Sequence, residues 1–189
     1  MSSIIQPDFK IYKNYLQALN KSVLISFFFT ILTATSMSQK LQTVPHVDLK
    51  KYEGKWYEIA SLPQRFQKGC NCTTAEYTLT DKDYVLVENR CNKGSINGKQ
   101  TYIKGKAFVV ENSGNAKLKV QFFWPFKGKY WIIELADNYS YAVVGHPNKN
   151  YLWILSRTST MKDATYQQII SSVQEKGFDI SKIKLTKQL

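Results

Sequence analysis

Between residues 54 and 157 the sequence repeats one pattern eight times: a short run that alternates apolar and polar residues, followed by a short turn. The runs are rich in β-branched and aromatic side chains, which is typical of antiparallel strands joined by hairpins. The predicted strands cover residues 54–61, 72–80, 84–91, 100–110, 116–123, 129–136, 139–145 and 151–157. Eight such strands leave two unpaired edges unless they close into a barrel, and a barrel of this size can hold one small ligand.

The periodicity changes after the eighth strand. Residues 159–177 carry apolar side chains at four-residue spacing, with Ser159 or Thr160 as the N-cap and Gly177 at the C-terminal end, which predicts one amphipathic helix. Residues 180–188 predict a last strand. The predicted fold class is all-β: an eight-stranded antiparallel up-and-down calyx barrel, with one C-terminal α-helix packed outside and a short ninth strand.

The N-terminal part of the chain has a different composition. Residues 22–34 form a mostly apolar run without any charged residue, which is shorter than the ~20 residues of a bilayer-spanning helix but suits the core of a secretory signal peptide. Small residues follow it, up to Ser38. We therefore expect residues 1–38 to be a cleaved extension and signal peptide, and residues 39–189 to be one domain. A retained membrane anchor is the alternative.

The chain is strongly basic, with 26 Lys and Arg against 14 Asp and Glu and a net charge of +12. The lysines are scattered, and the sequence contains neither a recognition helix nor an aromatic RNA-binding strand, which argues against a nucleic-acid partner. The charge indicates a solvated cationic surface, or attraction to an anionic membrane or ligand.

Three cysteines, Cys70, Cys72 and Cys91, lie in the predicted exported part, and their spacing is not that of a zinc site. An oxidising compartment favours one disulfide, with Cys91 paired to Cys70 or to Cys72. A hairpin with Leu79 opposite Tyr84 places Cys72 opposite Cys91, whereas a slip of two residues places Cys70 there.

Two motifs together resemble one known family. The Gly-x-Trp at Gly54 and Trp56 opens the first strand, and "YLWILSR", which ends at Arg157, directly precedes the helix. With these motifs, residues 44–187 resemble the lipocalins, and more narrowly the bacterial outer-membrane lipocalins and their apolipoprotein D-like relatives. The family's middle motif, TDY, is replaced here by "DNYSYAVV", as in that branch.

The resemblance implies a structural role for each matching residue. Gly54 lets the chain enter the barrel closely, Trp56 plugs the closed end, and Arg157 stacks on Trp56 across that end. It also implies a disulfide between Cys70 and Cys91, with Cys72 as the alternative. Relatives are often lipoproteins, but no cysteine lies at the candidate cleavage sites. We expect an exported protein of the periplasm or outer-membrane periphery, or a secreted one.

The ligand site of a lipocalin is the barrel interior. Because Trp56 points into the closed end, Glu58 and Ala60 on the same strand are expected to face inward as well. Trp153 is expected to line the cavity from the eighth strand. The further aromatic candidates are Phe108, Phe123, Tyr130, Trp131, Tyr139 and Tyr141. Phe66 and Phe126 lie on predicted loops and are expected at the rim of the open end.

Glu58 is the one charge predicted inside the barrel, where a carboxylate needs a partner. A hydrogen bond to a neighbouring tyrosine, a contact with a ligand ammonium group, and acid–base chemistry are three alternatives. The sequence contains no nucleophile elbow, phosphate-binding loop or dinucleotide fingerprint, so no enzyme activity, cofactor or metal is expected.

The predicted function is binding, storage or transport of a fatty acid, a lysophospholipid or a similar amphiphile in the bacterial cell envelope, in membrane maintenance or stress. The alternatives are an enzyme on a lipocalin scaffold, such as an isomerase or a de-epoxidase-like protein, and sequestration of an anionic metabolite such as a tetrapyrrole or siderophore. Besides the lipophilic ligand, peripheral membrane association and homodimerisation stay open.

Overall fold

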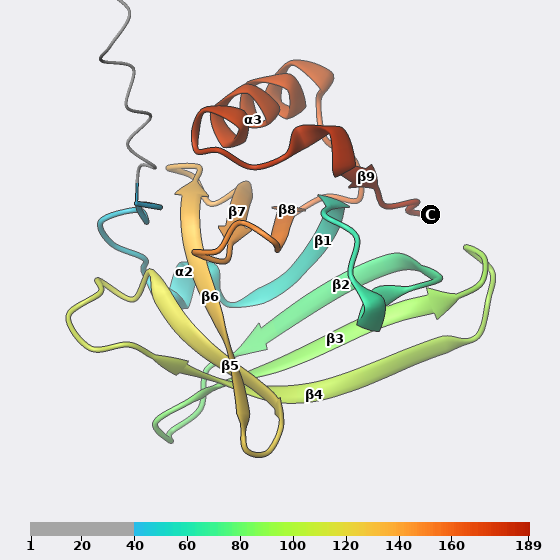
Figure 1. Ribbon diagram of the computed structural model, residues 1–189. Helices are drawn as coiled ribbons and strands as arrows, with labels where there is room; N and C mark the ends of the chain where they lie inside the picture. The colour runs from blue at the N-terminus through green and yellow to red at the C-terminus, as the bar shows by residue number, and fades with distance from the viewer. Residues whose placement is uncertain (1–39) are drawn as a thin grey trace, which may run out of the picture. The chain divides into compact units, whose positions relative to one another are not determined.

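The eight predicted strands form one closed antiparallel sheet in the computed structural model, which describes residues 40–189 (Figure 1). Each strand pairs with the next, and β8 and β2 both pair with β1, so the sheet closes into a barrel. The strands are β1 Gly54–Ser61, β2 Cys70–Thr78, β3 Val85–Lys93, β4 Gln100–Val109, β5 Lys117–Phe123, β6 Phe126–Leu135, β7 Tyr141–Gly145 and β8 Leu152–Ser156. The predicted fold class is confirmed.

Short elements accompany the barrel: the helix α2 Leu49–Tyr52 before β1, the 3₁₀ turns η1 Arg65–Gln67 and η2 Ile180–Lys182, and the strand β9 Lys184–Leu185. The predicted signal peptide, residues 1–38, lies outside the described residues. Among residues 40–189, no helix has both the length and the apolar character that a bilayer span requires.

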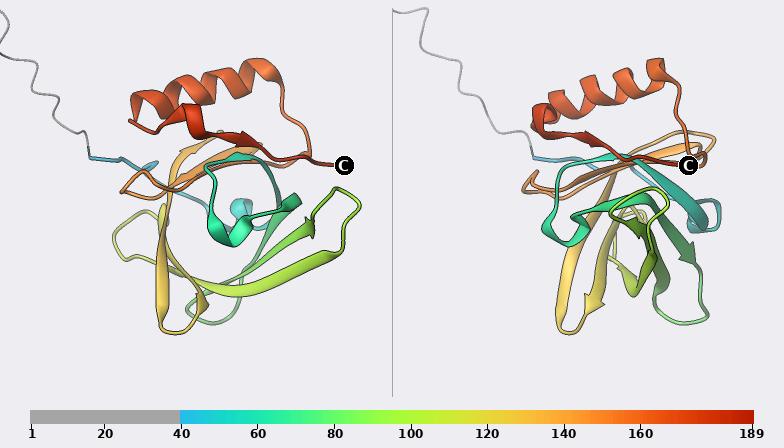
Figure 2. Two further views of the ribbon diagram at one scale, coloured as in Figure 1. Left: turned by 45° about the vertical axis from the view of Figure 1, so that its right-hand side comes forward. Right: turned by 90° about the vertical axis from the view of Figure 1, so that its right-hand side faces the viewer.

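The helix α3, Asp163–Glu175, lies across the outside of the barrel, above β6, β7, β8 and β1 (Figures 1 and 2). It begins four residues later than the sequence predicted, with Lys162 rather than Ser159 or Thr160 at the N-cap position and no capping side chain. Gly177, with φ +82°, follows its C-terminal end as predicted.

Two apolar clusters hold these layers together. One fills the barrel around Trp56, Val87, Leu118 and Ile132. The other joins the barrel wall to α3, where Ile169 and Val173 pack on the outward side chains of β1, β6, β7 and β8. These four strands are therefore apolar on both faces, because one face meets the barrel interior and the other meets the helix.

The β2–β3 hairpin differs from the predicted register. Thr78 pairs with Leu86, so the pairing is one residue away from the predicted one, and a bulge between Asn71 and Thr74 shifts it again near the strand's start. Cys70 and Cys91 form the disulfide, with their Cα atoms 5.4 Å apart. Cys72 lies in the bulge as a free thiol with φ +49°. The alternative pairing of Cys72 is therefore wrong.

Two other connections are also corrected. The loop predicted over residues 124–128 is only the two-residue turn Trp124–Pro125, because β6 already begins at Phe126. β7 begins later than predicted, since Tyr139 has φ +59° and belongs to the preceding turn.

Chain direction divides the loops between two ends of the barrel. The closed end carries α2 and the β2–β3, β4–β5 and β6–β7 connections. The open end carries the β1–β2, β3–β4, β5–β6 and β7–β8 connections. In both panels of Figure 2 the β5–β6 turn projects from the side of the barrel that faces away from α3. The half of the barrel next to the closed end is called the lower half below, and the half next to the open end the upper half.

Candidate functional site: the barrel interior and its open end

The closed end is sealed by Trp56 and Arg157. Trp56 is fully buried, and its Nε1 donates to the carbonyl of Tyr52 at 2.8 Å. The guanidinium carbon of Arg157 lies 3.8 Å from the centroid of the Trp56 ring, which is the cation–π contact that the family resemblance implied. Burial lowers the pKa of Arg157 from its ordinary value, although the nearby Tyr52 acts in the opposite direction.

The same guanidinium group also ties the chain segments of this end together. Its nitrogens donate to the carbonyls of Lys51, Lys55 and Tyr139 at 2.6, 3.0 and 3.4 Å. Gly54 has φ +93°, a left-handed conformation in which a residue with a side chain would be strained, although a Cβ there would make only an ordinary contact with Nη1 of Arg157, at 3.5 Å. The Gly-x-Trp and Arg157 motifs therefore form the floor of the barrel.

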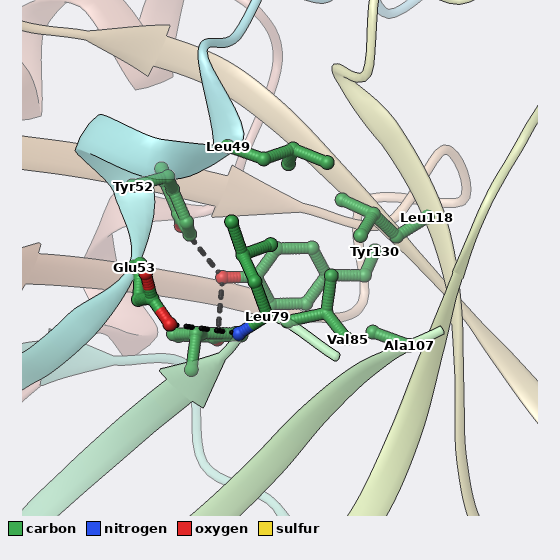
Figure 3. A pocket seen from close by; sticks show the side chains of 9 residues that line it. Leu49, Tyr52, Glu53, Leu79, Val85, Ala107, Leu118 and Tyr130 are labelled. Atoms are coloured by element: carbon green, nitrogen blue, oxygen red, sulfur yellow. Dashed lines mark hydrogen bonds between the residues drawn. The ribbon is translucent and has the colours of Figure 1, made fainter. Parts of the chain in front are cut away.

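Three tyrosines lie above this floor. The hydroxyl of Tyr130 is 2.8 Å from that of Tyr52 and 2.7 Å from that of Tyr77 (Figure 3). Burial raises the pKa of Tyr77 to about 12, and raises those of Tyr52 and Tyr130 well above the ordinary range. The cavity beside them measures about 10 Å³, room for about one water molecule. The lower half of the barrel is thus filled.

The half of the barrel next to the open end, which we call the upper chamber, is less fully buried. Its inward-facing side chains are only half-buried, although they lie on the same strand faces as the fully buried core; they include Ile103, Val120, Phe122 and Trp153. Their partial exposure distinguishes the upper chamber from the filled half next to the floor. Gly105 leaves room for Phe122, because a Cβ there would lie 2.7 Å from that ring.

Glu58 lies at the top of this chamber and is only 5% exposed. Its Oε1 accepts from Ser61 Oγ at 3.0 Å and from Thr186 Oγ1 at 2.6 Å, and its Oε2 accepts from Gln67 Nε2 at 2.8 Å. Gln67 Oε1 in turn accepts from the indole nitrogen of Trp153 at 3.1 Å. The predicted tyrosine partner is therefore wrong: the donors are two hydroxyls and an amide.

The C-terminal residues complete the wall beside Glu58. β1 and β2 pair only as far as Tyr57 and Thr74, and β9 then pairs with β1. The carbonyl of Lys187 accepts from the Cys72 amide at 2.7 Å, and the side chain of Gln188 donates to the carbonyls of Glu58 and Thr73. The chain end thus bridges the gap between the two strands.

Several residues predicted to line the barrel lie on its outside. Trp131 and Tyr141 pack with the cluster under α3. Phe108 is on the outer face of β4, where it contacts Tyr84 and the ammonium group of Lys127, 4.0 Å from the ring centroid. The prediction that these three side chains face the interior is wrong.

Three further placements also differ from the prediction. A bulge between Glu58 and Ala60 turns Ala60 toward the helix-side cluster. Tyr139 lies in the β6–β7 turn, where its hydroxyl accepts from the Asp48 amide at 2.9 Å and supports the closed end. Phe123 is 69% exposed beside the β5–β6 turn.

Trp153, Tyr130 and Glu58 are the predicted ligand-contact candidates that do face the lumen; ligand contact itself stays a prediction.

The open end carries an exposed aromatic tip, which we define as Phe123, Trp124 and Phe126. Trp124 is 86% exposed and Phe126 77% exposed. Lys127 and Lys129 follow directly on β6 and are exposed. Phe66, on the β1–β2 connection at the same end, is 66% exposed, so both aromatic residues predicted at the rim lie there.

Sequence reasoning missed four residues of the interior: Tyr52, Tyr77, Gln67 and Thr186. Tyr77 could have been found from the sequence pattern, because it lies two residues after Ala75, the β2 partner of Trp56, and therefore on the same inward face of the sheet. Gln67 and Thr186 lie on a loop and near the chain end, where no periodicity indicates the direction of a side chain.

Comparisons with known proteins agree with this geometry. A family model described as a lipocalin-like domain matches residues 47–188. The chain is 39% identical to temperature-induced lipocalin-1 of Arabidopsis thaliana, over 79% of this chain and 84% of that protein. It is 39% identical to the outer membrane lipoprotein Blc of Vibrio cholerae, over 80% and 89%. The structure of insecticyanin from Manduca sexta superposes with a TM-score of 0.65 at 23% identity, covering 80% of this chain and 86% of that one.

Proposed function

This chain belongs to the lipocalin family, whose members bind small hydrophobic ligands, and on that premise we propose that its upper chamber holds the hydrocarbon chain of a fatty acid, lysophospholipid or similar amphiphile. The observation that carries the proposal is the contrast within the lumen. The tyrosine layer fills the lower half, whereas the inward-facing apolar side chains above it are only partly buried.

Burial of hydrocarbon supplies the affinity of such a site. At about 25 cal/mol per Å² of apolar surface, a chain that buries ~300 Å² gains on the order of 7 kcal/mol before ordering costs. The hydrocarbon chain would end at the tyrosine hydroxyls, because these are hydrogen-bonded to one another and form a polar layer. The apolar side chains of Val120 and Phe122 would contact the chain above that layer. No reacting group is needed for this function.

The proposed setting is the cell envelope, with a role in membrane maintenance or stress. The disulfide between Cys70 and Cys91 supports a location outside the cytoplasm, where such bonds persist. Relatives named as outer membrane lipoproteins support the same compartment.

The aromatic tip supports exchange of ligand with a membrane. Phe123, Trp124 and Phe126 stand at the open end, through which a ligand would enter, and Lys127 and Lys129 lie next to them. Aromatic rings favour the membrane–water interface, and each basic residue near an anionic surface adds about 1 kcal/mol of attraction. We therefore place the mouth of the barrel against an anionic bilayer during exchange.

No observation favours the two alternatives considered from the sequence. A tetrapyrrole or siderophore with several negative charges would place them beside the carboxylate of Glu58, whereas a fatty acid needs only its hydrocarbon chain inside the barrel. The three side-chain hydrogen bonds of Glu58 come from neutral groups, and among residues 40–189 none of its hydrogen-bond partners is the second ionisable group that acid–base chemistry would require.

The test is a pair of variants on adjacent positions of β5. Val120→Trp fills the chamber, because Val120 faces inward, whereas Gln121→Trp adds the same side chain on the outer face beside Lys106. We expect native mass spectrometry of delipidated protein to show one bound lysophospholipid per chain. Val120→Trp should weaken binding at least about tenfold and Gln121→Trp should not. Equal binding by both variants, or none by the unmodified protein, would refute the proposal.

A further inference from the structure

Among the residues that the structure describes, the carboxylate of Glu58 has no cationic partner. It is nearly buried, and all three of its hydrogen bonds come from neutral side chains. The ion pairs found among residues 40–189 involve Glu88, Glu134 and Asp179, but not Glu58. A buried charge is normally paired, so this negative charge in a chain of net charge +12 is unexpected.

An aromatic ladder leads from the rim of the barrel to this carboxylate. Phe66 is stacked on Tyr151 with centroids 6.3 Å apart, and Tyr151 is stacked on Trp153 with centroids 6.1 Å apart. Trp153 is joined to Glu58 through the single side chain of Gln67. The outermost ring is exposed to solvent, whereas the innermost faces the chamber.

This combination has a specific chemical preference. A quaternary ammonium group is attracted to the faces of Trp and Tyr, and the attraction strengthens where water is excluded. It also offers the unpaired carboxylate a counter-charge without needing a hydrogen-bond acceptor, since the group has no N–H. A fatty-acid carboxylate at the same place would meet Glu58 as a like charge.

We propose that the upper end of the chamber is a site for a quaternary ammonium head group, so that the preferred ligand is a single-chain amphiphile with a choline-type head. This inference rests on the proposed function, because the head group is held there by a chain lying in the barrel below. Glu58 supplies the counter-charge, Trp153 and Tyr151 supply the ring faces, and Gln67 positions the carboxylate relative to Trp153.

The test uses three ligands with the same dodecyl chain, studied below their critical micelle concentrations: dodecyltrimethylammonium, dodecanol and dodecanoate. Isothermal titration to delipidated protein should give the tightest binding for the ammonium compound, by about tenfold over the alcohol, and the weakest for the carboxylate. Glu58→Gln should remove the preference while leaving the affinity for dodecanol unchanged. Glu88→Gln, on the outer face of β3 beside Lys104, is the matched control and should keep it.

The outcomes separate the two proposals. If all three ligands bind equally, or Glu58→Gln keeps the ammonium preference, the head-group site is refuted but the hydrocarbon chamber stands. If dodecanoate binds most tightly, the head-group site is refuted as well. If none of the ligands binds, the proposed function fails, and the head-group site fails with it.

Discussion

The two ends of this barrel use the same kinds of side chain for different purposes. At the closed end Trp56 is fully buried, and Arg157 above its ring is fixed by three backbone carbonyls. At the open end Trp124 is 86% exposed, and lysines follow it along the strand. The buried ring of Trp56 under a fixed cation stabilises the fold, whereas the ring of Trp124 is exposed to solvent and contributes little to the stability of the fold.

The open end is nevertheless well held. The Cys70–Cys91 disulfide joins β2 to β3 near the mouth, and the C-terminal residues bridge β1 and β2 beside Glu58. These contacts fix the β1, β2 and β3 side of the mouth, next to the connection that carries Phe66.

The largest effect on stability is expected at the floor. Trp56→Ala removes a fully buried indole and should lower the free energy of unfolding by about 3–5 kcal/mol. Urea denaturation followed by circular dichroism measures the loss. Trp124→Ala is the matched control at the other end and should change stability by less than about 0.5 kcal/mol. Similar losses for both variants would contradict the contrast between the two ends.

Removal of the disulfide tests how strongly the open end is held. Cys70→Ser should cost about 2–4 kcal/mol, because the bond closes a loop of 21 residues in the unfolded chain. The same denaturation experiment under non-reducing conditions measures it. Cys72→Ser, which removes only the free thiol, should leave stability within about 0.5 kcal/mol. A larger loss for Cys72→Ser would mean that the pairing differs from the one described.

Arg157 should contribute less than Trp56 because it is partly solvated. Arg157→Met keeps an apolar side chain but leaves three carbonyls without their donor, and should cost about 2 kcal/mol. Lysophospholipid affinity, measured on the same variant, should be unchanged, because the floor does not reach the upper chamber. A loss of lysophospholipid affinity without a loss of stability would mean that Arg157 serves ligand binding and not the fold, and would contradict this assignment.

Alkaline pH should weaken the tyrosine layer. The pKa of Tyr77 is raised to about 12 in the folded protein, against about 10 when unfolded, so its contribution is fully present below about pH 10 and is lost as the pH rises toward 12. The free energy of unfolding should therefore fall as the pH rises through that range, because the unfolded chain loses this proton first. Denaturation at a series of pH values and the phenolate absorbance measure it. Ionisation of every tyrosine near pH 10 without unfolding would contradict the burial of this layer.

The smallest effect on the fold is expected at the aromatic tip, where the consequence is for membrane binding. Trp124→Ala should reduce co-sedimentation with phosphatidylglycerol vesicles several-fold and leave the affinity for a soluble dodecyl ligand unchanged. Trp131→Phe, on the outer wall under α3, is the control and should bind vesicles normally. Unchanged vesicle binding by Trp124→Ala would remove the tip from the proposed exchange step.

The architecture could be predicted from the sequence because strand alternation, the change of period at the helix, and the Gly54, Trp56 and Arg157 motifs are local signals. The orientation of aromatic residues could not be predicted in the same way. Trp131 and Tyr141 lie on strands whose outer face is covered by α3, so an apolar side chain there fits either face. Alternation was also interrupted by the bulge between Glu58 and Ala60.

The environment of Glu58 depends on contacts between distant segments. Its burial could be predicted from Trp56, two residues earlier on the same face. Its partners could not, since Gln67 comes from a 3₁₀ turn and Thr186 is 128 residues away in sequence. The disulfide shows the same limit, because the bulge at Cys72 shifts the register that the hairpin alone would have set.

The most direct test of the hydrocarbon chamber is fluorescence quenching by a dodecyl ligand that carries a bromine on a carbon close to its head group. The experiment uses Trp124→Phe as the background and compares two further substitutions in it, Trp153→Phe and Trp131→Phe. Trp153 faces the chamber and Trp131 lies outside the barrel wall. We predict that the bound ligand quenches the emission of the Trp131→Phe protein, and that most of this quenching is lost in the Trp153→Phe protein. Quenching that depends on Trp131 and not on Trp153 would place the ligand outside the barrel and contradict the central claim.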